Sequence, residues 1–176
     1  EIRKKHARKA LKILGVQEIR FLDLPNQELD QIPLLKIIKE IEKEIFETKT
    51  DLIFTHHYND LNLDHRVAYE ATITAARPIP DSQVSSIISF EIPAATDWRK
   101  PYKFNPNLYI DISSQLTAKI NALKAYEYEF RKPPHPRSKE MTEAVAKRWG
   151  SLSGFKAAEA FEIVMSRMTN LEKISL

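Results

Sequence analysis

Residues 51–71 read DLIFTHHYNDLNLDHRVAYEA, a stretch in which an apolar run, a histidine-rich segment and a helical pattern follow one another. The apolar run from Leu52 to Thr55 is too short for a helix and is typical of a strand buried on both faces. After His65, the apolar residues recur at helical spacing. The segment from Thr55 to His65 therefore reads as a loop between a strand and a helix, where open α/β sheets bind their ligands.

On the N-terminal side of this loop, helical and strand patterns alternate. The patterns predict a helix over 2–14 that ends at Gly15, a short strand over 17–22 and a helix over 34–47.

The same alternation continues on the C-terminal side. We expect a helix that Asp64 caps, a strand over 84–90, a long loop over 91–107 and a strand over 108–111. Further on we expect a helix that Ser113 or Ser114 caps, a helix from Ser138 to Arg148 that Gly150 stops, and a final strand near 161–166. A helix over 157–161 is an open alternative to the beginning of that strand.

This order of elements predicts a three-layer α/β/α sandwich with a Rossmann-like, mainly parallel sheet. The length of 176 residues fits one domain, and no linker or internal repeat divides it. The right-handed crossover rule then puts the His-rich loop at the carboxyl edge of the sheet.

Composition narrows the possible functions. A formal charge of +3 with scattered lysines and no arginine-rich stripe gives no support to nucleic acid binding. Because the chain has no cysteine, any metal must be bound through nitrogen and oxygen. No segment is long and apolar enough for a membrane span, and no signal peptide is visible. A cytoplasmic enzyme or binding domain is the default, with a homo-oligomer left open.

The loop holds three of the five histidines of the chain. His65 follows Asp64 at a helix start, where a neighbouring carboxylate or a backbone carbonyl can fix its tautomer, as metal-ligating histidines require. His56 and His57 point to opposite sides of an extended chain, so at most one of them faces the same cavity as His65. Asp60 and Asn62 are expected to brace the loop as Asx-type turns, with or without a functional role.

A second candidate segment is Pro133 to Ser138. Its three prolines stiffen the backbone around His135 and Arg137, which suits a proton donor and a group that binds an anion or a hydroxyl. A rigid surface connection is the alternative. Phosphate-binding glycine loops and a Gly-x-Ser-x-Gly elbow are missing from the sequence.

Together these motifs resemble the LmbE/PIG-L family of metal-dependent N-deacetylases, which act on N-acetylglucosaminyl compounds. The resemblance runs along nearly the whole chain. It rests on the helix with Arg3 that ends Leu14-Gly15-Val16, on Phe21-Leu22-Asp23, on Thr55 to Val67, on Ala75 to Pro78, on Pro134 to Ser138 and on Ala158 to Phe161.

The resemblance implies a zinc ion, an N-acetylated amino sugar as substrate and a place in glycan synthesis. His65 matches a metal ligand, and Asp64 matches the neighbour that orients the site. Arg3 matches an arginine that contacts substrate, and Asn62 and Arg137 join it as substrate-binding candidates. Asn62 stands where relatives often carry a histidine; an amide donates a hydrogen bond to a developing oxyanion but delivers no proton. His57 or His135 is then the proposed acid.

The family's His-Pro-Asp-Asp motif, which supplies the other two ligands and the base, is absent from these residues. The chain also begins within a helical pattern at Glu1, so we expect the first strand and its loop to lie upstream and these 176 residues alone to be inactive. A processed terminus is the alternative explanation. A sugar-binding or assembly relative without catalysis, and an unrelated α/β domain with an incidental His-rich loop, are the alternative functions.

Overall fold

A computed structural model describes residues 1–80 and 82–168 of the chain. The residues divide into two compact units. The first unit consists of Glu1–Leu22 and Tyr109–Ala160, and the second consists of Asp23–Leu108 and the residues from Phe161 onward. The interpretation of 1–176 as a single domain stays a prediction.

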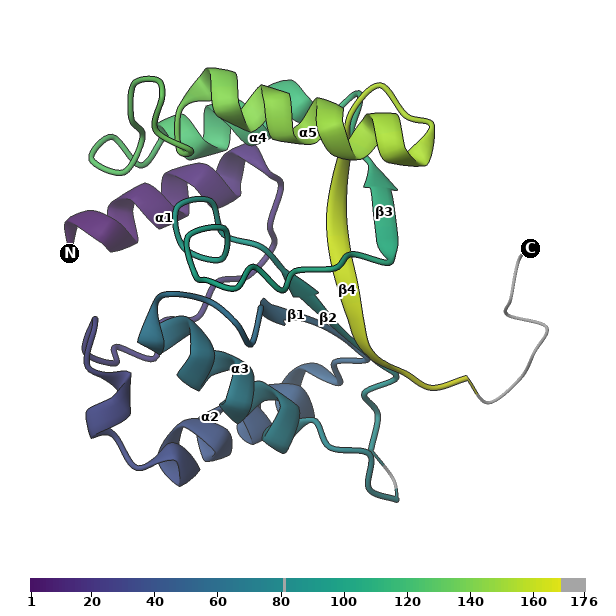
Figure 1. The fold of residues 1–176 in the computed structure, drawn as a ribbon. Coiled ribbons are helices and arrows are strands. Elements are labelled where there is room, and N and C mark those ends of the chain that lie inside the picture. The colour runs from purple at the N-terminus through teal and green to yellow at the C-terminus, as the bar shows by residue number, and fades with distance from the viewer. Residues whose placement is uncertain (81, 169–176) are drawn as a thin grey trace. The chain divides into compact units, whose positions relative to one another are not determined.

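Helices and strands follow the predicted order with one exception (Figure 1). The elements are α1 Ile2–Ile13, the short 3-10 helix η1 Leu29–Gln31, α2 Leu34–Thr48, β1 Leu52–His56, α3 Leu63–Ala75, β2 Ser86–Phe90, β3 Leu108–Asp111, α4 Leu116–Lys124, α5 Lys139–Ser153 and β4 Ala158–Ser166. In the part of the chain that the structure describes, no helix is both long and apolar enough to cross a membrane.

The four strands form one sheet in the order β1-β2-β4-β3, and its pairing is mixed. β1 and β2 are parallel, with His56 beside Phe90, whereas β2 and β4 are antiparallel, with Phe90 beside Phe161. The α/β class is therefore confirmed, and the expected parallel pairing applies to β1 and β2. The final strand is confirmed and begins at Ala158, which decides against a helix over 157–161.

The predicted strand over 17–22 is the exception, because these residues have no strand structure. A strand exists only when its backbone groups pair with a neighbour. The local pattern at Ile19 to Leu22 favours an extended chain, but no described strand pairs with it. Strand propensity alone therefore led to a wrong prediction for residues 17–22.

Apolar stripes on α2 and α3 make the core of the second unit. Ile37 and Ile38 of α2 are buried against Ala71 of α3, as the three and four residue spacing predicts. Val84 and Ile87 pack with Ala76 at the end of α3. This packing holds the start of α3 close to the end of β1, and so positions the loop between them.

Two predicted helix boundaries need correction. Asn62, not Asp64, caps α3, because its side-chain oxygen accepts a hydrogen bond from the backbone N–H of Asp64 at 2.9 Å. Gly150 does not stop α5 but lies within it, and the helix ends at Gly154, whose φ of 80° is the left-handed conformation that glycine permits. Ser138 caps α5 as predicted, through a hydrogen bond from the N–H of Met141.

α4 also begins later than predicted. The helix starts at Leu116 after Gln115, and Ser113 instead donates its hydroxyl hydrogen to Asp111. This local bond competes with capping, as short polar side chains often do.

Gly150 allows a close approach of backbone to backbone in the first unit. A Cβ atom at this position would lie 2.6 Å from the Phe155 carbonyl oxygen and 2.9 Å from Ala157 Cα. We expect Gly150→Ala to lower the free energy of unfolding by about 1–3 kcal/mol through overpacking, although alanine is favoured over glycine in helices by about 1 kcal/mol. Urea unfolding measures the change.

The matched control is the exposed neighbour Ser151. Ser151→Ala should leave the free energy of unfolding within about 0.5 kcal/mol of the wild type. A Gly150→Ala variant as stable as the wild type would show that the backbone contact is not tight.

Candidate functional site

The loop between His56 and Leu63 leaves the carboxyl end of β1 and enters α3, as the sequence predicts. Its backbone is braced by two arginines. Arg66 Nη1 donates to the carbonyl oxygens of Asp60 at 2.7 Å and Leu61 at 2.9 Å. Arg99 Nε donates to Asn59 Oδ1 at 3.1 Å, which ties the loop to the segment around residue 99. The loop is consequently a rigid platform for its side chains.

Asp60 is the buried centre of this loop, with a fully buried side chain. Its Oδ1 accepts the backbone N–H of Asn62 at 2.8 Å, which confirms the expected Asx-type turn, and its Oδ2 accepts the hydroxyl of Thr96 at 2.7 Å. Desolvation raises the pKa of the Asp60 carboxyl, but the contacts with His65, Thr96 and Asn62 outweigh it and leave the pKa below its ordinary value of 3.8. Asp60 is therefore a carboxylate at neutral pH.

His65 lies between Asp60 and Asn62. Its Nδ1 is 3.1 Å from Asp60 Oδ1, at an angle short of a full hydrogen bond, and its Nε2 is 3.3 Å from Asn62 Nδ2. Because Asn62 Oδ1 already accepts the N–H of Asp64, the amide group facing His65 is the donor, and Nε2 of His65 is the acceptor. The proton of the neutral ring is then on Nδ1, toward the carboxylate.

Asp64 does not contact His65 as the neighbour that orients the site, which was its predicted role, but binds a distant backbone segment. Its two carboxylate oxygens accept the backbone N–H groups of Gln27 at 2.6 Å and Leu29 at 3.1 Å. The carboxylate beside His65 is that of Asp60, five residues earlier. Asp64 thus holds the segment before η1 against the start of α3, and it acts on the site through backbone position.

The structure separates the two adjacent histidines as predicted. The His56 ring stacks on His65, with ring centroids 4.0 Å apart and planes 5° from parallel. Burial, followed by the proximity of His65, lowers the pKa of His56 to about 4, so this imidazole is neutral at physiological pH. His56 is therefore the one that shares the surroundings of His65.

His57 points to the other side and is fully buried. Its Nδ1 accepts the backbone N–H of Asn59 at 3.1 Å, and its Nε2 donates to Glu162 Oε2 at 3.2 Å. Burial lowers the pKa of His57, although the Glu162 carboxylate acts in the opposite direction. Since both ring nitrogens have partners, this arrangement favours a structural role over that of a proton donor. No sequence pattern marked Glu162, which is distant along the chain.

The other candidates lie in the first unit, where Arg3 and Arg137 share one carboxylate. Arg3 Nη2 is 3.6 Å from Glu129 Oε1, and Arg137 Nη1 donates to Glu129 Oε2. His135 Nδ1 accepts the backbone N–H of Arg137 at 3.0 Å, which fixes its ring orientation. The structure thus brings Arg3 and Arg137 together on Glu129, a carboxylate that no sequence pattern marked, and His135 lies beside Arg137.

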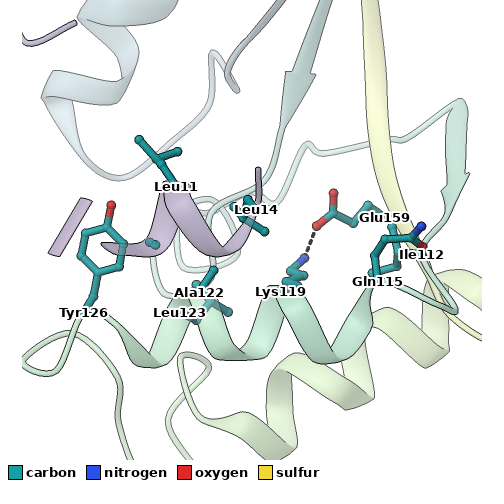
Figure 2. Close-up of a pocket in the computed structure, with 10 residues that line it drawn as sticks. Leu11, Leu14, Ile112, Gln115, Lys119, Ala122, Leu123, Tyr126 and Glu159 are labelled. Carbon is teal, nitrogen blue, oxygen red and sulfur yellow. Dashed lines mark hydrogen bonds and ion pairs between the residues drawn. The ribbon is translucent and has the colours of Figure 1, made fainter. Parts of the chain in front are cut away.

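Two pockets lie apart from these candidate side chains. Figure 2 shows one of about 400 Å³ in the first unit, where Leu11 of α1 and Leu14 just after this helix approach α4, with the Lys119 and Glu159 ion pair among its lining residues. The other, of about 600 Å³, is lined in the second unit by Tyr58, by residues 29–34 and by Leu63, Arg66, Val67 and Glu70 of α3. Those four α3 residues share one helical face, and His65 is on the opposite face.

A complete metal site is not present in residues 1–80 and 82–168, where no three His, Asp or Glu side chains cluster as ligands. Within the described residues, His65 has two features of a ligand: a carboxylate at Nδ1 and an acceptor lone pair at Nε2. The zinc ion that the resemblance implies stays a prediction.

Comparison with known proteins supports the resemblance seen in the motifs. The family model described as PIG-L, GlcNAc-PI de-N-acetylase, matches residues 1–76, which include the Arg3 helix and the His65 loop. The motifs around 134–138 and 158–161 lie outside this match. The uncharacterized deacetylase YaiS of Escherichia coli (strain K12) is 26% identical over 130 residues, which cover 71% of this chain and 65% of that protein. The chain thus matches just under two thirds of this curated relative.

Solved structures confirm the fold along almost the whole chain. The conserved protein TT1542 from Thermus thermophilus has a TM-score of 0.75 at 18% identity, with 99% of this chain and 78% of that chain covered. The N,N'-diacetylchitobiose deacetylase from Pyrococcus horikoshii has a TM-score of 0.72 at 20% identity, with 93% and 63% covered. GalB, the 4-carboxy-2-hydroxymuconate hydratase from Pseudomonas putida KT2440, has a TM-score of 0.74 at 17% identity, with 96% and 73% covered. At these identities the likeness establishes the fold alone.

Asp60 gives this site a testable dependence on pH. Asp60→Asn places an amide where three donors converge, so we expect the free energy of unfolding to fall by about 1–3 kcal/mol at pH 7. Because the folded-state pKa of Asp60 is lowered, its stabilising effect is present above about pH 4 and is lost as the pH falls through the folded-state value. Urea unfolding of both proteins across this range measures the difference, which should narrow in acid.

The exposed Asp30 provides the control. Asp30→Asn should change the free energy of unfolding by no more than about 0.5 kcal/mol. Equal stability of Asp60→Asn and the wild type at pH 7 would contradict the role given to the buried carboxylate.

Proposed function

We propose that the protein is a zinc-dependent N-deacetylase that hydrolyses the acetyl amide of an N-acetylated amino sugar or its conjugate. The observation that carries the proposal is the state of His65, whose Nδ1 faces a buried carboxylate while Nε2 is an acceptor in a rigid loop. The match of the de-N-acetylase family model to residues 1–76, which contain this loop, supports the reaction class. The names of YaiS and of the chitobiose deacetylase support the same class.

In this proposal His65 binds the metal through Nε2. When bound, zinc polarises a carbonyl and lowers the pKa of a coordinated water towards about 7. The Asp60 carboxylate holds the proton of His65 on Nδ1 and so leaves the lone pair on Nε2. The hydrogen bond that this lone pair accepts from Asn62 Nδ2 would give way to the metal. Thr96 and the N–H of Asn62 keep that carboxylate in place. A complete set of ligands, with three His, Asp or Glu side chains, is not found among the described residues.

Asn62 is the proposed donor to the oxygen of the acetyl group. Its Nδ2 already lies 3.3 Å from His65 Nε2, and its Oδ1 is held by the N–H of Asp64, which fixes the direction of the amide. Such a preoriented donor stabilises negative charge as it develops on a carbonyl oxygen. The leaving amine needs a proton from another group, and His135 stays the predicted source, with Arg3 and Arg137 as predicted substrate contacts.

The second candidate is a sugar-binding or assembly protein of the same fold that lacks catalysis. The incomplete set of metal ligands within residues 1–80 and 82–168 favours it. Structural likeness to a hydratase also means that this fold carries more than one chemistry. Metal content together with acetate release discriminates between the two. The cytoplasmic location and the role in glycan synthesis stay predictions from the sequence.

The first test of the proposed function removes the ligand. In the natural full-length protein, His65→Ala should lower zinc affinity by more than about 100-fold, since even the outer partners of a ligand contribute about 10–100-fold. Acetate release from N-acetylglucosaminyl compounds should fall in parallel. Zinc content by elemental analysis and a coupled acetate assay measure both quantities.

His6, on α1 in the first unit, is the matched control, and His6→Ala should keep zinc and turnover. Unchanged zinc occupancy in His65→Ala would rule out the ligand assignment. Wild-type protein that binds zinc and sugar but releases no acetate would favour the second candidate.

A second test separates the two roles of Asn62. Serine is also a good helix cap, so Asn62→Ser should keep the free energy of unfolding within about 0.5 kcal/mol of the wild type. It removes the amide donor, however, and kcat should fall about 100-fold. Asn62→Ala should lose both the turnover and about 1 kcal/mol of stability.

Steady-state kinetics and urea unfolding of the same preparations provide the comparison. A fully active Asn62→Ser variant would mean that Asn62 only caps the helix.

A further inference from the structure

His56 buries a ring nitrogen that has no partner. Its Nδ1 is inaccessible to solvent and makes no hydrogen bond within the described residues, while Nε2 is not among the buried atoms and has no partner among those residues either. A buried polar atom without a partner costs about 1–3 kcal/mol, and phenylalanine would fill the same space without that cost. Packing alone therefore does not account for an imidazole here.

The position of the ring is tightly defined by its neighbours. His56 is the last residue of β1 and pairs with Phe90 of β2, whose ring centroid is 5.0 Å away. The ring also stacks on His65, with ring centroids 4.0 Å apart. His56 thus contacts both a ring of the sheet and the ring of His65 in the candidate site.

The two imidazoles of this pair bury the same ring nitrogen. Their planes are 5° from parallel, and the Nδ1 atoms of both rings are buried. The Nε2 of His56 is the nitrogen of this ring that is not buried. The stack therefore places an accessible imidazole nitrogen next to the ring of His65.

Parallel stacking argues against His56 as a second ligand of the same metal ion. Two imidazoles bound to one tetrahedral zinc at about 2.0–2.1 Å need lone pairs that converge on the ion. An imidazole lone pair lies in the plane of its ring, so in stacked parallel rings 4.0 Å apart the lone pairs lie in two separate planes and do not converge on one ion. The remaining role for this nitrogen is a hydrogen bond to a molecule held next to the metal.

We propose that His56 Nε2–H donates a hydrogen bond to the substrate beside the zinc ion that His65 binds, and that His56 is a catalytic residue of the deacetylation. The inference rests on the proposed function. With the proton on Nε2, the buried Nδ1 is an unpaired acceptor. The stack on His65 and the tilted contact with Phe90 hold the donor in a fixed direction, so it is oriented before the substrate binds.

The test uses His56→Phe in the natural full-length protein, since phenylalanine keeps the ring contacts with Phe90 and His65 but has no nitrogen. We expect zinc content to match the wild type, the melting temperature to be equal or higher because the unpartnered nitrogen is gone, and kcat to fall about 100-fold. His56→Gln, whose amide can reach toward the position of Nε2, should recover part of the lost kcat. His6→Phe is the matched control and should leave all three quantities unchanged.

Each other result overturns the inference. Wild-type kcat in His56→Phe would mean that the ring only packs, and loss of zinc together with kcat would mean that His56 acts on the metal site. If His56→Phe does not fold, His56→Gln decides, and kcat equal to that of His56→Ala would then exclude a donor role. The proposed function fails differently, because then the wild type itself releases no acetate.

Discussion

The buried carboxylate of Asp60 is the constraint on which the candidate site depends. Charge placed in a protein interior is stable only when donors surround it. Asp60 meets this condition with the N–H of Asn62, the hydroxyl of Thr96 and the nearby ring of His65. The same contacts shape the loop, link it to the segment that contains Thr96 and fix the tautomer of His65. Local structure, stability and chemistry are therefore set by one side chain.

Most of the fold could be predicted from the sequence because its signals are local. The apolar spacing of α2, the short run of β1 and the capping serine of α5 depend on residues within one or two turns. The failures have the opposite origin. Residues 17–22 have the composition of a strand but no strand beside them, and Gly150 looks like a helix stop although it serves a backbone contact with Phe155. Pairing with a partner strand decides the structure of residues 17–22, and close packing of backbone on backbone decides the place of Gly150.

The candidate site was predictable to a similar degree and for similar reasons. The crowding of His65 with Asp60, Asn62 and Asp64 is visible in the sequence, yet spacing alone did not show which carboxylate faces the imidazole. The separation of His56 from His57 follows from strand geometry, but the partners of each depend on Phe90 and Glu162 from distant segments. Glu129, which meets Arg3 and Arg137, had no local signal either.

The contact between His57 and Glu162 has a consequence for the synthesis of the protein. His57 lies in the loop after β1, whereas Glu162 belongs to β4, so 105 residues separate the two partners. Glu162 also accepts the backbone N–H of Asn105. A nascent chain in which only the β1 loop has left the ribosome cannot satisfy the buried ring. The His57 side chain acquires this hydrogen bond only after β4 emerges, and until then its Nε2 group depends on water.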